Sequence, residues 1–418
     1  MIEIKPLSHC DASITLPGSK SYTHRALVLA ALANGDSLLI NPLRSEDTEY
    51  TIQGLKEFGV PIVWERDSLC VCGGGGKFRG GNVELFVGNS GTSMRFLTAL
   101  AALREGQTRV DGNERMRKRP ISDQLTGLEA LGVRACSPEG EGCPPVMVES
   151  NGLDGGTAAI KADKSSQFLS ALLMVAPYAR RDVCIKIDGH LASKPYVDMT
   201  LHVMQTFGVK VERKGYHSFY VRTGQRYAPQ EYRVEADATN ASYFFSAAAI
   251  TRGKVRVENF GSTRFQGDAG FLTVLETMGC KVVTGDGWAE VHGRELHGIK
   301  IDMNEMPDLV PTLAVTAAFA RGKTVIENIG HLRFKESDRI ETVARELSRA
   351  GIRIEEGRDW LKVEGGEVHG AEIETYNDHR LAMSFAVAGL AVPGVKIKGE
   401  RCVDKSFPDF WEVFQRLY

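Results

Sequence analysis

The stretch PGSKSYTHRALVLAAL, residues 17–32, sets Lys20 and Arg25 against a run of small apolar residues. A run that is apolar nearly all round predicts a buried helix, and the first turn of a helix has unpaired backbone N–H groups and a partial positive charge. Anions bind at such a helix start, and cations beside it strengthen the attraction. The stretch therefore predicts a binding site for a small anion.

Polar residues also precede the other apolar runs of the chain, and cations lie among them or in adjoining loops. Ser, Thr, Asn and Asp at these positions serve as helix caps whether or not they have a function. The cations are Lys20, Arg25, Arg95, Arg119, Lys335, Arg339, Arg380 and Lys405. A single Lys or Arg is usually a solvated surface charge, but converging cations suit a small substrate with several negative charges, held by bidentate contacts.

Proton transfer needs other groups, and the sequence offers Asp308 in MPDLVPT, Glu336 in FKESDRIET, and Asp378 with His379 in TYNDHR. Each carboxylate has a structural alternative. Glu336 and Arg339 stand three residues apart, a spacing that is also typical of an exposed ion pair of little energetic weight. The residues alone leave both interpretations open.

The pattern of a polar turn, a small-residue apolar helix and a strand occurs six times. Its repeats are marked by Ser19, Gly91, Ser165, Thr239, Pro307 and Asn377, which stand 68 to 74 residues apart. A second series ends amphipathic patterns with a glycine that we expect to cap a helix, at Gly59, Gly132, Gly208, Gly279 and Gly351. Hairpins such as IRIEEGRDWLKVEGG close some repeats. The periodicity predicts a mixed α/β protein built from six repeats.

A chain of 418 residues is too long for one ordinary core, so we expect two lobes of three repeats each. One lobe comprises residues 18–235, and the other comprises residues 1–17 with 236–418. The N-terminal strand MIEIKPLSHCDASITL is expected to pair into the C-terminal lobe. The chain would then cross between the two lobes twice, with Pro17-Gly18 as a hinge.

The composition excludes several classes of protein. It is 43% hydrophobic and 25% charged, as in globular proteins, and a formal net charge of -2 provides no global basic field for nucleic acid or a membrane. The N-terminus has no signal or transit pattern and no apolar run approaches about 18 residues, which predicts a cytosolic protein. The eight cysteines form no CxxC pair and have no His at ligand spacing, so we expect free thiols and no metal.

The glycine run GGGGKF, residues 73–78, does not match a phosphate-binding loop. It lacks the first glycine at the required spacing and places Phe78 where Ser or Thr would reach magnesium. We interpret it as a hairpin turn.

Eight motifs together resemble the 5-enolpyruvylshikimate-3-phosphate synthases of the enolpyruvyl transferase family. In chain order from Leu16 to Phe410 they are PGSKSYTHR, GNSGTSMR, RMRKRP, SSQF, SKPYVDMT, FKESDR, TYNDHRLAM and KSFPDF. The resemblance implies a two-lobed inside-out α/β barrel of six βαβαββ repeats, three in each lobe, with the reaction in the cleft between them. It implies no cofactor, and a monomer whose partners are small molecules.

The implied reaction transfers the carboxyvinyl group of phosphoenolpyruvate to the 5-hydroxyl of shikimate 3-phosphate and releases phosphate. It proceeds by addition and elimination through a tetrahedral intermediate, in the shikimate pathway to chorismate and the aromatic amino acids. Both substrates are phosphorylated carboxylates, which accounts for local cations in a chain of near-zero net charge.

The resemblance also implies residue roles. Shikimate 3-phosphate would be bound by Lys20, Ser21, Arg25, Ser165, Ser166, Gln167, Ser193, Tyr196, Asp308, His331 and Lys335. Phosphoenolpyruvate would be bound by Lys20, Asn89, Gly91, Arg119, Gln167, Arg339, Arg380 and Lys405. Asp308 would accept the hydroxyl proton, and Glu336 would donate and accept a proton at C3, assisted by Lys20 and His379. His331 stands where the family often has Asn, and a side chain at Gly91 would intrude on a tightly held small ligand.

Two rival functions remain. The sister enolpyruvyl transferase that acts on UDP-N-acetylglucosamine is expected to have a Lys-Asn pair near its start and a cysteine in a mobile loop. Here Ser21 follows Lys20, and the loop GNERMRKRP has no cysteine. A non-catalytic repeat protein that binds anions would need the cations but no placed carboxylates, so Asp308, Glu336 and His379 argue against it.

Overall fold

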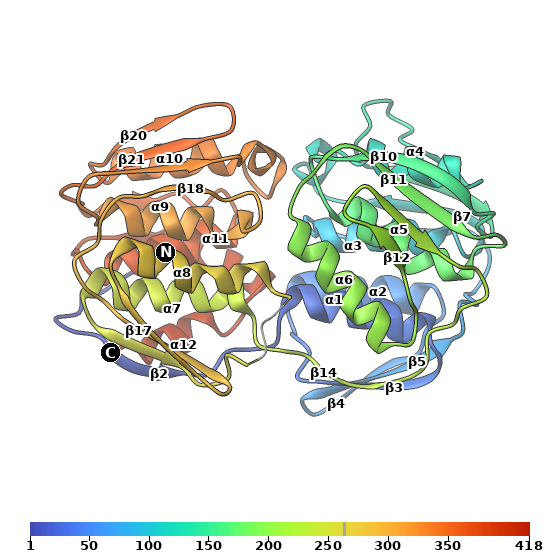
Figure 1. The fold of residues 1–418 in the computed structure, drawn as a ribbon, viewed down its shortest axis with the longest axis horizontal. Helices are drawn as coiled ribbons and strands as arrows, with labels where there is room; N and C mark the ends of the chain where they lie inside the picture. Colours follow the sequence, from blue (N-terminus) through green and yellow to red (C-terminus); the bar gives the residue numbers. More distant parts are fainter. Residues whose placement is uncertain (262–264) are drawn as a thin grey trace. The chain divides into compact units, whose positions relative to one another are not determined.

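The computed structural model describes residues 1–261 and 265–418 (Figure 1). The chain divides into two compact units: unit 1 comprises residues 1–17 and 235–418, and unit 2 comprises residues 18–234. Each unit contains three small sheets and three helices that are buried along nearly their whole length. No helix in the described ranges is long and apolar enough to cross a membrane.

Unit 2 is built from twelve of the described strands and six α-helices. The strands are β3 (Asn34–Ile40), β4 (Ile62–Glu65), β5 (Ser68–Gly74), β6 (Val83–Phe86), β7 (Glu105–Asp111), β8 (Arg134–Cys136), β9 (Val146–Asn151), β10 (Gly156–Ala162), β11 (Val183–Leu191), β12 (Glu212–Lys214), β13 (Ser218–Val221) and β14 (Glu231–Arg233). The helices are α1 (Lys20–Leu32), α2 (Glu46–Glu57), α3 (Gly91–Ala101), α4 (Ser122–Ala130), α5 (Gln167–Val175) and α6 (Lys194–Thr206). The sheet orders are β14-β3-β5-β4, β6-β7-β9-β8 and β10-β11-β13-β12.

Unit 1 repeats this plan. Its strands are β1 (Ile2–Glu3), β2 (Asp11–Ile14), β15 (Lys254–Val257), β16 (Lys281–Gly285), β17 (Trp288–His292), β18 (Lys300–Asp302), β19 (Lys323–Glu327), β20 (Arg353–Glu356), β21 (Leu361–Glu364), β22 (Glu372–Ile373) and β23 (Lys396–Ile397). Its helices are α7 (Ala238–Thr251), α8 (Phe271–Met278), α9 (Val310–Ala318), α10 (Arg339–Arg349), α11 (His379–Gly389) and α12 (Phe410–Gln415). The sheet orders are β16-β17-β15-β2, β18-β19-β21-β20 and β1-β23-β22.

The predicted six-fold repetition is confirmed by the topology. In the second repeat β6 leads through α3 to the parallel strand β7, and α4 leads to the antiparallel hairpin β8-β9. The third and fifth repeats have the same βαβαββ order. In the sixth repeat β22 and β23 flank α11, and β1 from the N-terminus pairs antiparallel with β23 where the other repeats have a hairpin.

The first and fourth repeats exchange their first strands. β2 precedes α1 in the chain but pairs in parallel with β15, whereas β14 precedes α7 but pairs in parallel with β3. The pairing expected for the N-terminal strand is therefore present, and the reciprocal pairing of β14 completes it. At the start of unit 2 a Cβ on Gly18 would lie 2.0 Å from the carbonyl oxygen of Asn41, so only glycine fits there.

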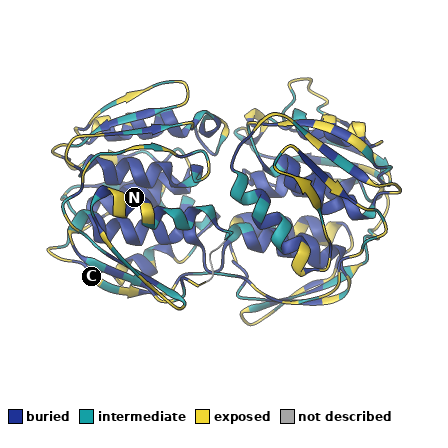
Figure 2. Ribbon diagram, in the orientation of Figure 1, coloured by how far each residue is buried: buried dark blue, intermediate teal, exposed yellow. Residues whose placement is uncertain are grey.

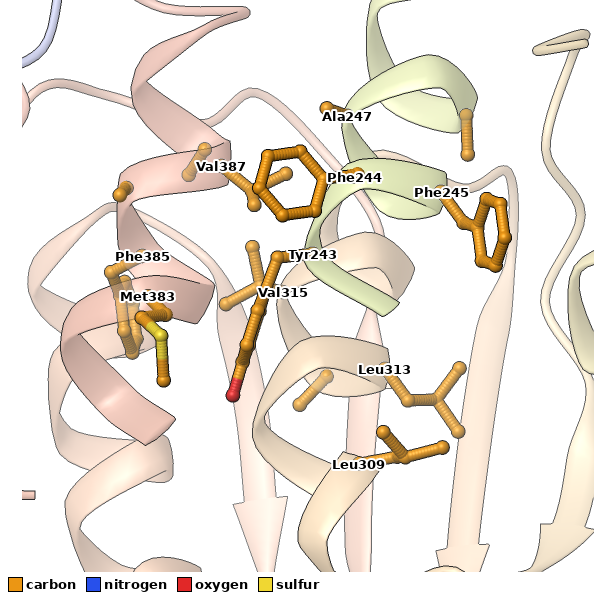
Figure 3. Packing of buried hydrophobic residues seen from close by; sticks show 14 of the residues in the cluster. Tyr243, Phe244, Phe245, Ala247, Leu309, Leu313, Val315, Met383, Phe385 and Val387 are labelled. Atoms are coloured by element: carbon orange, nitrogen blue, oxygen red, sulfur yellow. The ribbon is translucent and has the colours of Figure 1, made fainter. Parts of the chain in front are cut away.

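Burial follows the predicted distinction between the two helix series. The helices α1, α3, α5, α7, α9 and α11 are buried on nearly all sides, whereas α2, α4, α6, α8, α10 and α12 bury one face (Figure 2). In unit 1 the side chains of Tyr243 and Phe244 on α7 pack among residues of α9 and α11 (Figure 3). Burial of one such large apolar side chain contributes about 1.5–3 kcal/mol to stability, so these helices are held by packing more than by intrinsic propensity.

The helix ends form largely as the sequence predicts, although Asp308, expected at the start of an apolar helix, makes no side-chain cap to α9. Asp237, Ser19, Ser90 and Asp378 cap α7, α1, α3 and α11 by accepting a hydrogen bond from a backbone N–H of the first turn. The five predicted capping glycines all have positive φ, between 86° and 117°: Gly59, Gly132, Gly208, Gly279 and Gly351. L-residues avoid this conformation, which is why glycine marks the end of the amphipathic helix in each of these repeats.

One local prediction is right and one is wrong. The segment IRIEEGRDWLKVEGG forms the antiparallel hairpin β20-β21. The run GGGGKF is not a hairpin turn, because Gly73 and Gly74 end β5 and the next strand, β6, belongs to another sheet. A Cβ on Gly73 would lie 2.3 Å from the carbonyl oxygens of both Ala30 and Ala33, so the glycine is required by the close approach of β5 to α1.

Candidate functional site

In unit 2 the predicted cations lie at the starts of buried helices and are fixed mainly by neutral oxygen atoms. Lys20 is the first residue of α1, and its Nζ lies 3.2 Å from Oδ2 of Asp47, in the first turn of α2. The buried guanidinium of Arg25 donates to Oγ1 of Thr200 at 2.7 Å and to the carbonyl oxygens of Ser21 and Tyr196 at 3.0 and 3.1 Å. Burial lowers the pKa of Arg25 to about 10.

A second pair of arginines lies against the start of α3. Nη1 of Arg119 donates to the carbonyl oxygen and to Oδ1 of Asn89, at 2.9 and 3.1 Å, and Nη1 of Arg95 donates to the carbonyl oxygen of Gly91 at 2.9 Å. A Cβ on Gly91 would lie 2.4 Å from Nη1 of Arg95 and 2.5 Å from Nη2 of Arg119. The absence of a side chain at Gly91 therefore lets both guanidinium groups approach the helix start.

Hydroxyl and amide groups line the remaining helix starts of unit 2. The backbone N–H of Gln167 donates to Oγ of Ser165 at 3.2 Å, and its side-chain Nε2 donates to Oγ1 of Thr92 at 2.9 Å, which joins the start of α5 to the start of α3. Ser166 is buried and precedes α5. Ser193 precedes α6 in a left-handed conformation with φ 55°, and Tyr196 lies in the first turn of that helix.

Hydrogen bonds between side chains connect these helices into one group. Oγ1 of Thr200 on α6 donates to Oγ of Ser170 on α5 at 2.9 Å, and the hydroxyls of Thr51 on α2 and Ser93 on α3 lie 2.8 Å apart. We use the name α1 cluster for the predicted binding residues of unit 2 that lie at or beside these helix starts. Its members are Lys20, Ser21, Arg25, Asn89, Gly91, Arg119, Ser165, Ser166, Gln167, Ser193 and Tyr196. The arrangement presents cations, hydroxyls and backbone N–H groups, which together suit phosphate and carboxylate ligands.

In unit 1 a single arginine pairs with three carboxylates. Arg339 begins α10 with 1% of its side chain exposed. Its Nη1 lies 2.9 Å from Oδ1 of Asp308, its Nη2 lies 2.8 Å from Oε2 of Glu336, and its Nε lies 2.8 Å from Oδ2 of Asp378. Burial alone would lower the pKa of Arg339, but the three carboxylates hold it above its usual value. The exposed ion pair considered for Glu336 and Arg339 is therefore excluded.

Asp308 lies among three cations. Besides Arg339, it lies 3.9 Å from Nζ of Lys335 and 3.4 Å from Nη2 of Arg380, and 21% of its side chain is exposed. Burial raises the pKa of a carboxyl, but the charges of Lys335, Arg339 and Arg380 outweigh this effect and hold the pKa of Asp308 well below its usual range. Asp308 is consequently ionised and accessible.

Arg380 is held from the helix α7. Its Nη1 donates to the hydroxyl of Tyr243 at 3.0 Å and lies 3.5 Å from Oδ1 of Asn240. Burial raises the pKa of Tyr243 to about 12, although the charge of Arg380 opposes the rise. We call Asp308, Lys335, Glu336, Arg339, Asp378 and Arg380 the Arg339 cluster.

The other predicted residues of unit 1 are buried near these elements. His379 follows Asp378 at the start of α11, and its Nδ1 lies 3.8 Å from Oδ1 of that residue. His331 lies in the 3-10 helix η5 (Gly330–Phe334) and is 7% exposed, and Lys335 directly follows this helix. Lys405 ends the 3-10 helix η6 (Glu400–Lys405), which packs against α11.

Sequence reasoning missed several residues that hold these groups. Asp47, Thr200 and Tyr243 each bond to a predicted cation, but nothing in the local pattern distinguishes them from helix caps and core residues. Asp378 was considered for proton chemistry, yet its oxygens accept from Nε of Arg339, from Oγ of Ser337 at 2.9 Å and from the backbone N–H of Arg380 at 3.0 Å. Asp378 is fully buried and is an anchor for Arg339.

The chain is similar to known proteins along its full length. The family described as EPSP synthase (3-phosphoshikimate 1-carboxyvinyltransferase) matches residues 4–414. Proteins named 3-phosphoshikimate 1-carboxyvinyltransferase from Nostoc punctiforme and a Marinomonas species are 48% and 43% identical over 420 residues, which are 100% of this chain and 99% of each relative.

Solved structures agree with the sequence comparison. A structure of EPSP synthase from Acinetobacter baumannii has a TM-score of 0.82 and 29% identity, and the match covers 99% of this chain and 97% of that one. The structure of an enolpyruvyl transferase from Streptomyces tendae has a TM-score of 0.79 and 19% identity over 99% of this chain and 96% of that one, which shows a shared fold.

Proposed function

The chain belongs to the EPSP synthase family and transfers the enolpyruvyl group of phosphoenolpyruvate to shikimate 3-phosphate, and we propose that the α1 cluster and the Arg339 cluster divide this reaction between them. The α1 cluster binds the phosphate and carboxylate groups. The Arg339 cluster binds phosphoenolpyruvate and moves the protons.

Binding to the α1 cluster rests on the cations and hydroxyls that it gathers at helix starts. Arg25 donates to one hydroxyl and two carbonyl oxygens, which are neutral groups, so its charge favours the binding of an anion. We assign shikimate 3-phosphate to Ser21, Arg25, Ser165, Ser166, Ser193 and Tyr196 of this cluster, with His331 and Lys335 from unit 1. We assign phosphoenolpyruvate to Asn89, Gly91 and Arg119, with Arg339, Arg380 and Lys405 from unit 1. Lys20 and Gln167 contact both substrates.

Asp308 accepts the proton of the 5-hydroxyl as its oxygen adds to C2 of phosphoenolpyruvate. The charges of Lys335, Arg339 and Arg380 hold its pKa far below the range of an effective base. The bound phosphate and carboxylate groups neutralise Lys335, Arg339 and Arg380, which raises the pKa of Asp308 and makes the carboxylate a competent acceptor. Substrate binding thus activates the base.

Glu336 transfers protons to and from C3 of phosphoenolpyruvate. It donates one proton to C3 during addition and accepts one from C3 as the tetrahedral intermediate loses phosphate, with Lys20 and His379 assisting. Its position beside Arg339, at 2.8 Å, supports this role because the arginine stabilises the carboxylate that forms after donation. Glu336 and Asp308 share Arg339, so their protonation states are coupled.

The observation that carries this assignment is the pairing of one buried arginine with Asp308 and Glu336, beside Lys335 and Arg380. A protein that only bound anions would gain nothing from carboxylates placed among its cations, since they weaken anion binding. The sister reaction on UDP-N-acetylglucosamine is disfavoured because the relatives at 43–48% identity are named for the shikimate substrate.

Release of inorganic phosphate from phosphoenolpyruvate and shikimate 3-phosphate, measured without metal or nucleotide, tests the activity. UDP-N-acetylglucosamine as acceptor is the control and is expected to give no phosphate. Release with the nucleotide sugar alone would instead assign the chain to the sister reaction.

The variant Asp308→Asn tests the role of Asp308 as the proton acceptor. Its control is Glu341→Gln, which removes an exposed carboxylate that pairs with Arg345. Only the first variant should lose turnover.

The cellular setting expected from the sequence, a monomer in the cytosol without a cofactor, remains a prediction. Size-exclusion chromatography with light scattering on the full chain measures the oligomeric state. A single species near the mass of one chain is the expected result.

A further inference from the structure

The turn that leads into α11 has an unusual backbone. Tyr376 and Asn377 both adopt the left-handed conformation, with φ 52° and 55°. Among the described residues, this is the one place where two non-glycine residues do so in succession. The left-handed conformation is unfavourable for an L-residue, less so for Asn and more so for a bulky residue such as Tyr. Contacts elsewhere must therefore hold the turn.

Two of those contacts come from one buried carboxylate, and the guanidinium of Arg345 also lies 5.9 Å from the centroid of the Tyr376 ring. Glu346 on α10 has no exposed surface. Its Oε1 accepts from the hydroxyl of Tyr376 at 2.7 Å, and its Oε2 accepts from the backbone N–H of Glu374 at 3.0 Å. Glu346 thus accepts one hydrogen bond from a residue before the turn and one from a residue within it. A hydrogen bond of 2.8 Å from the N–H of Asp378 to the carbonyl oxygen of Thr375 closes the turn.

Helix α10 also bonds to the residue that follows the turn. Arg339 and Glu346 lie seven residues apart on α10, two helical turns, and Nε of Arg339 donates to Oδ2 of Asp378. A rigid helix therefore fixes the turn through Glu346 and the residue that follows the turn through Arg339. Any relaxation of residues 376–377 would shift Asp378 away from Arg339 and would move Arg380 with it.

We propose that Glu346 is a positioning residue for the reaction. It keeps Tyr376 and Asn377 in the left-handed conformation, so that Asp378 keeps its hydrogen bonds with Arg339 and Arg380 keeps its place beside Asp308. The proposal rests on the proposed function of the Arg339 cluster. A purely structural Glu346 is the alternative. In that case its loss would reduce the folded fraction but leave the kinetic constants of the folded protein unchanged.

Tyr376→Phe tests the link because it removes the hydroxyl donor and retains the ring. Because a hydrogen bond to a charged acceptor is among the stronger ones in proteins, we expect its loss to lower kcat/KM for phosphoenolpyruvate about tenfold or more. The effect should appear mainly as a higher KM for phosphoenolpyruvate, whereas the affinity for shikimate 3-phosphate should change less than twofold. Tyr418→Phe is the matched control, since it removes an exposed hydroxyl that donates to the carbonyl oxygen of Lys5 at 2.6 Å.

The strain is tested by a matched pair at Asn377, which is exposed. In the Tyr376→Phe background, Asn377→Gly removes the cost of the left-handed conformation and Asn377→Ala increases it. We expect the glycine double variant to exceed the alanine double variant in kcat/KM about fivefold, the equivalent of about 1 kcal/mol. Equal values for the two double variants would overturn the proposal, as would unchanged kinetics of folded Glu346→Gln.

Hydrogen exchange separates this proposal from the proposed function. The amide of Asp378 donates within the turn, so its exchange should speed up in Tyr376→Phe and slow again when Asn377→Gly is added. This measurement needs no turnover. Failure of the wild-type phosphate-release assay would refute the proposed function and leave the exchange result interpretable, whereas unchanged exchange in an active enzyme would refute the role of Glu346.

Discussion

Arg25 in unit 2 and Arg339 in unit 1 are both almost fully buried, yet their charges are compensated differently. Arg25 donates to a hydroxyl and two carbonyl oxygens, and burial lowers its pKa to about 10. Arg339 faces three carboxylates, which raise its pKa despite burial. An uncompensated cation attracts an anionic ligand, whereas a cation among carboxylates sets their protonation. This difference supports the proposal that the α1 cluster serves mainly to bind anions, whereas the Arg339 cluster binds phosphoenolpyruvate and also transfers protons.

The largest expected effect is on stability. Arg339→Met leaves Asp308, Glu336 and Asp378 without their shared cation, and breaking a buried ion pair costs about 3–5 kcal/mol. Arg25→Met removes a cation that no carboxylate needs, so we expect less than half of that loss together with weaker binding of shikimate 3-phosphate. Denaturant unfolding of both variants measures the free energies. Equal losses would contradict the distinction between the clusters.

Asp308→Asn should separate turnover from binding. Removal of a proton acceptor costs about 2 kcal/mol or more of transition-state stabilisation, roughly 30-fold in kcat. The amide also removes a negative charge from beside Lys335 and Arg380, so substrate affinity should hold or improve. Steady-state kinetics with both substrates varied distinguishes these effects. Matching losses in affinity and rate would make Asp308 a binding residue.

Asp268 offers a comparison within unit 1, because burial and the nearby charge of Asp308 raise its pKa to about 7. Asp268 lies in the 3-10 helix η3 (Gly267–Gly270) and accepts a hydrogen bond from the hydroxyl of Thr239. The folded protein then keeps a proton that the unfolded chain loses near pH 4, so this group lowers stability as pH rises from about 4 to 7. We expect Asp268→Asn to be more stable than wild type at pH 8, by up to about 2 kcal/mol, with the difference fading toward pH 4.

Asp308 has the opposite pH dependence. Its folded pKa lies below the unfolded value near 4, so its contribution is complete above about pH 4 and is lost as pH falls further. Urea unfolding of wild type, Asp268→Asn and Asp308→Asn at several pH values measures both effects. Parallel pH profiles for the two variants would show that these carboxylates do not differ as described.

The smallest expected effect is at the start of α3. Gly91→Ala would place a methyl group within 2.5 Å of both Arg95 and Arg119, and because these atoms end flexible side chains we expect a cost at the low end of overpacking, about 1 kcal/mol. We expect a higher KM for phosphoenolpyruvate, with little change in affinity for shikimate 3-phosphate, because Arg119 moves and Arg25 does not. Gly366→Ala, at a glycine without a positive φ whose added Cβ would meet no atom within 4 Å, serves as a control for stability. Equal KM values for wild type and Gly91→Ala would show that Arg119 is not displaced.

Local features could be read from the amino-acid sequence because short-range physics specifies them. Glycines such as Gly132 and Gly351 mark helix ends because only glycine readily adopts their left-handed backbone, and Ser19 and Asp378 mark helix starts because their side chains bond to the next turn. Repetition of these signals at intervals of about 70 residues sufficed to predict six repeats and the starts at which cations gather.

Apart from the local pair of Glu336 and Arg339, the partners of the buried charged groups were decided by the tertiary structure alone. Arg339 shares its charge with Asp308 and Asp378, which stand 31 and 39 residues away, and β14 leaves its own repeat to pair with β3. Glu346 carries no sequence signal at all, since a glutamate on an amphipathic helix is ordinarily a surface residue. Contacts between segments distant in the chain depend on how all the helices pack together, and no local pattern encodes which carboxylate a buried arginine will meet.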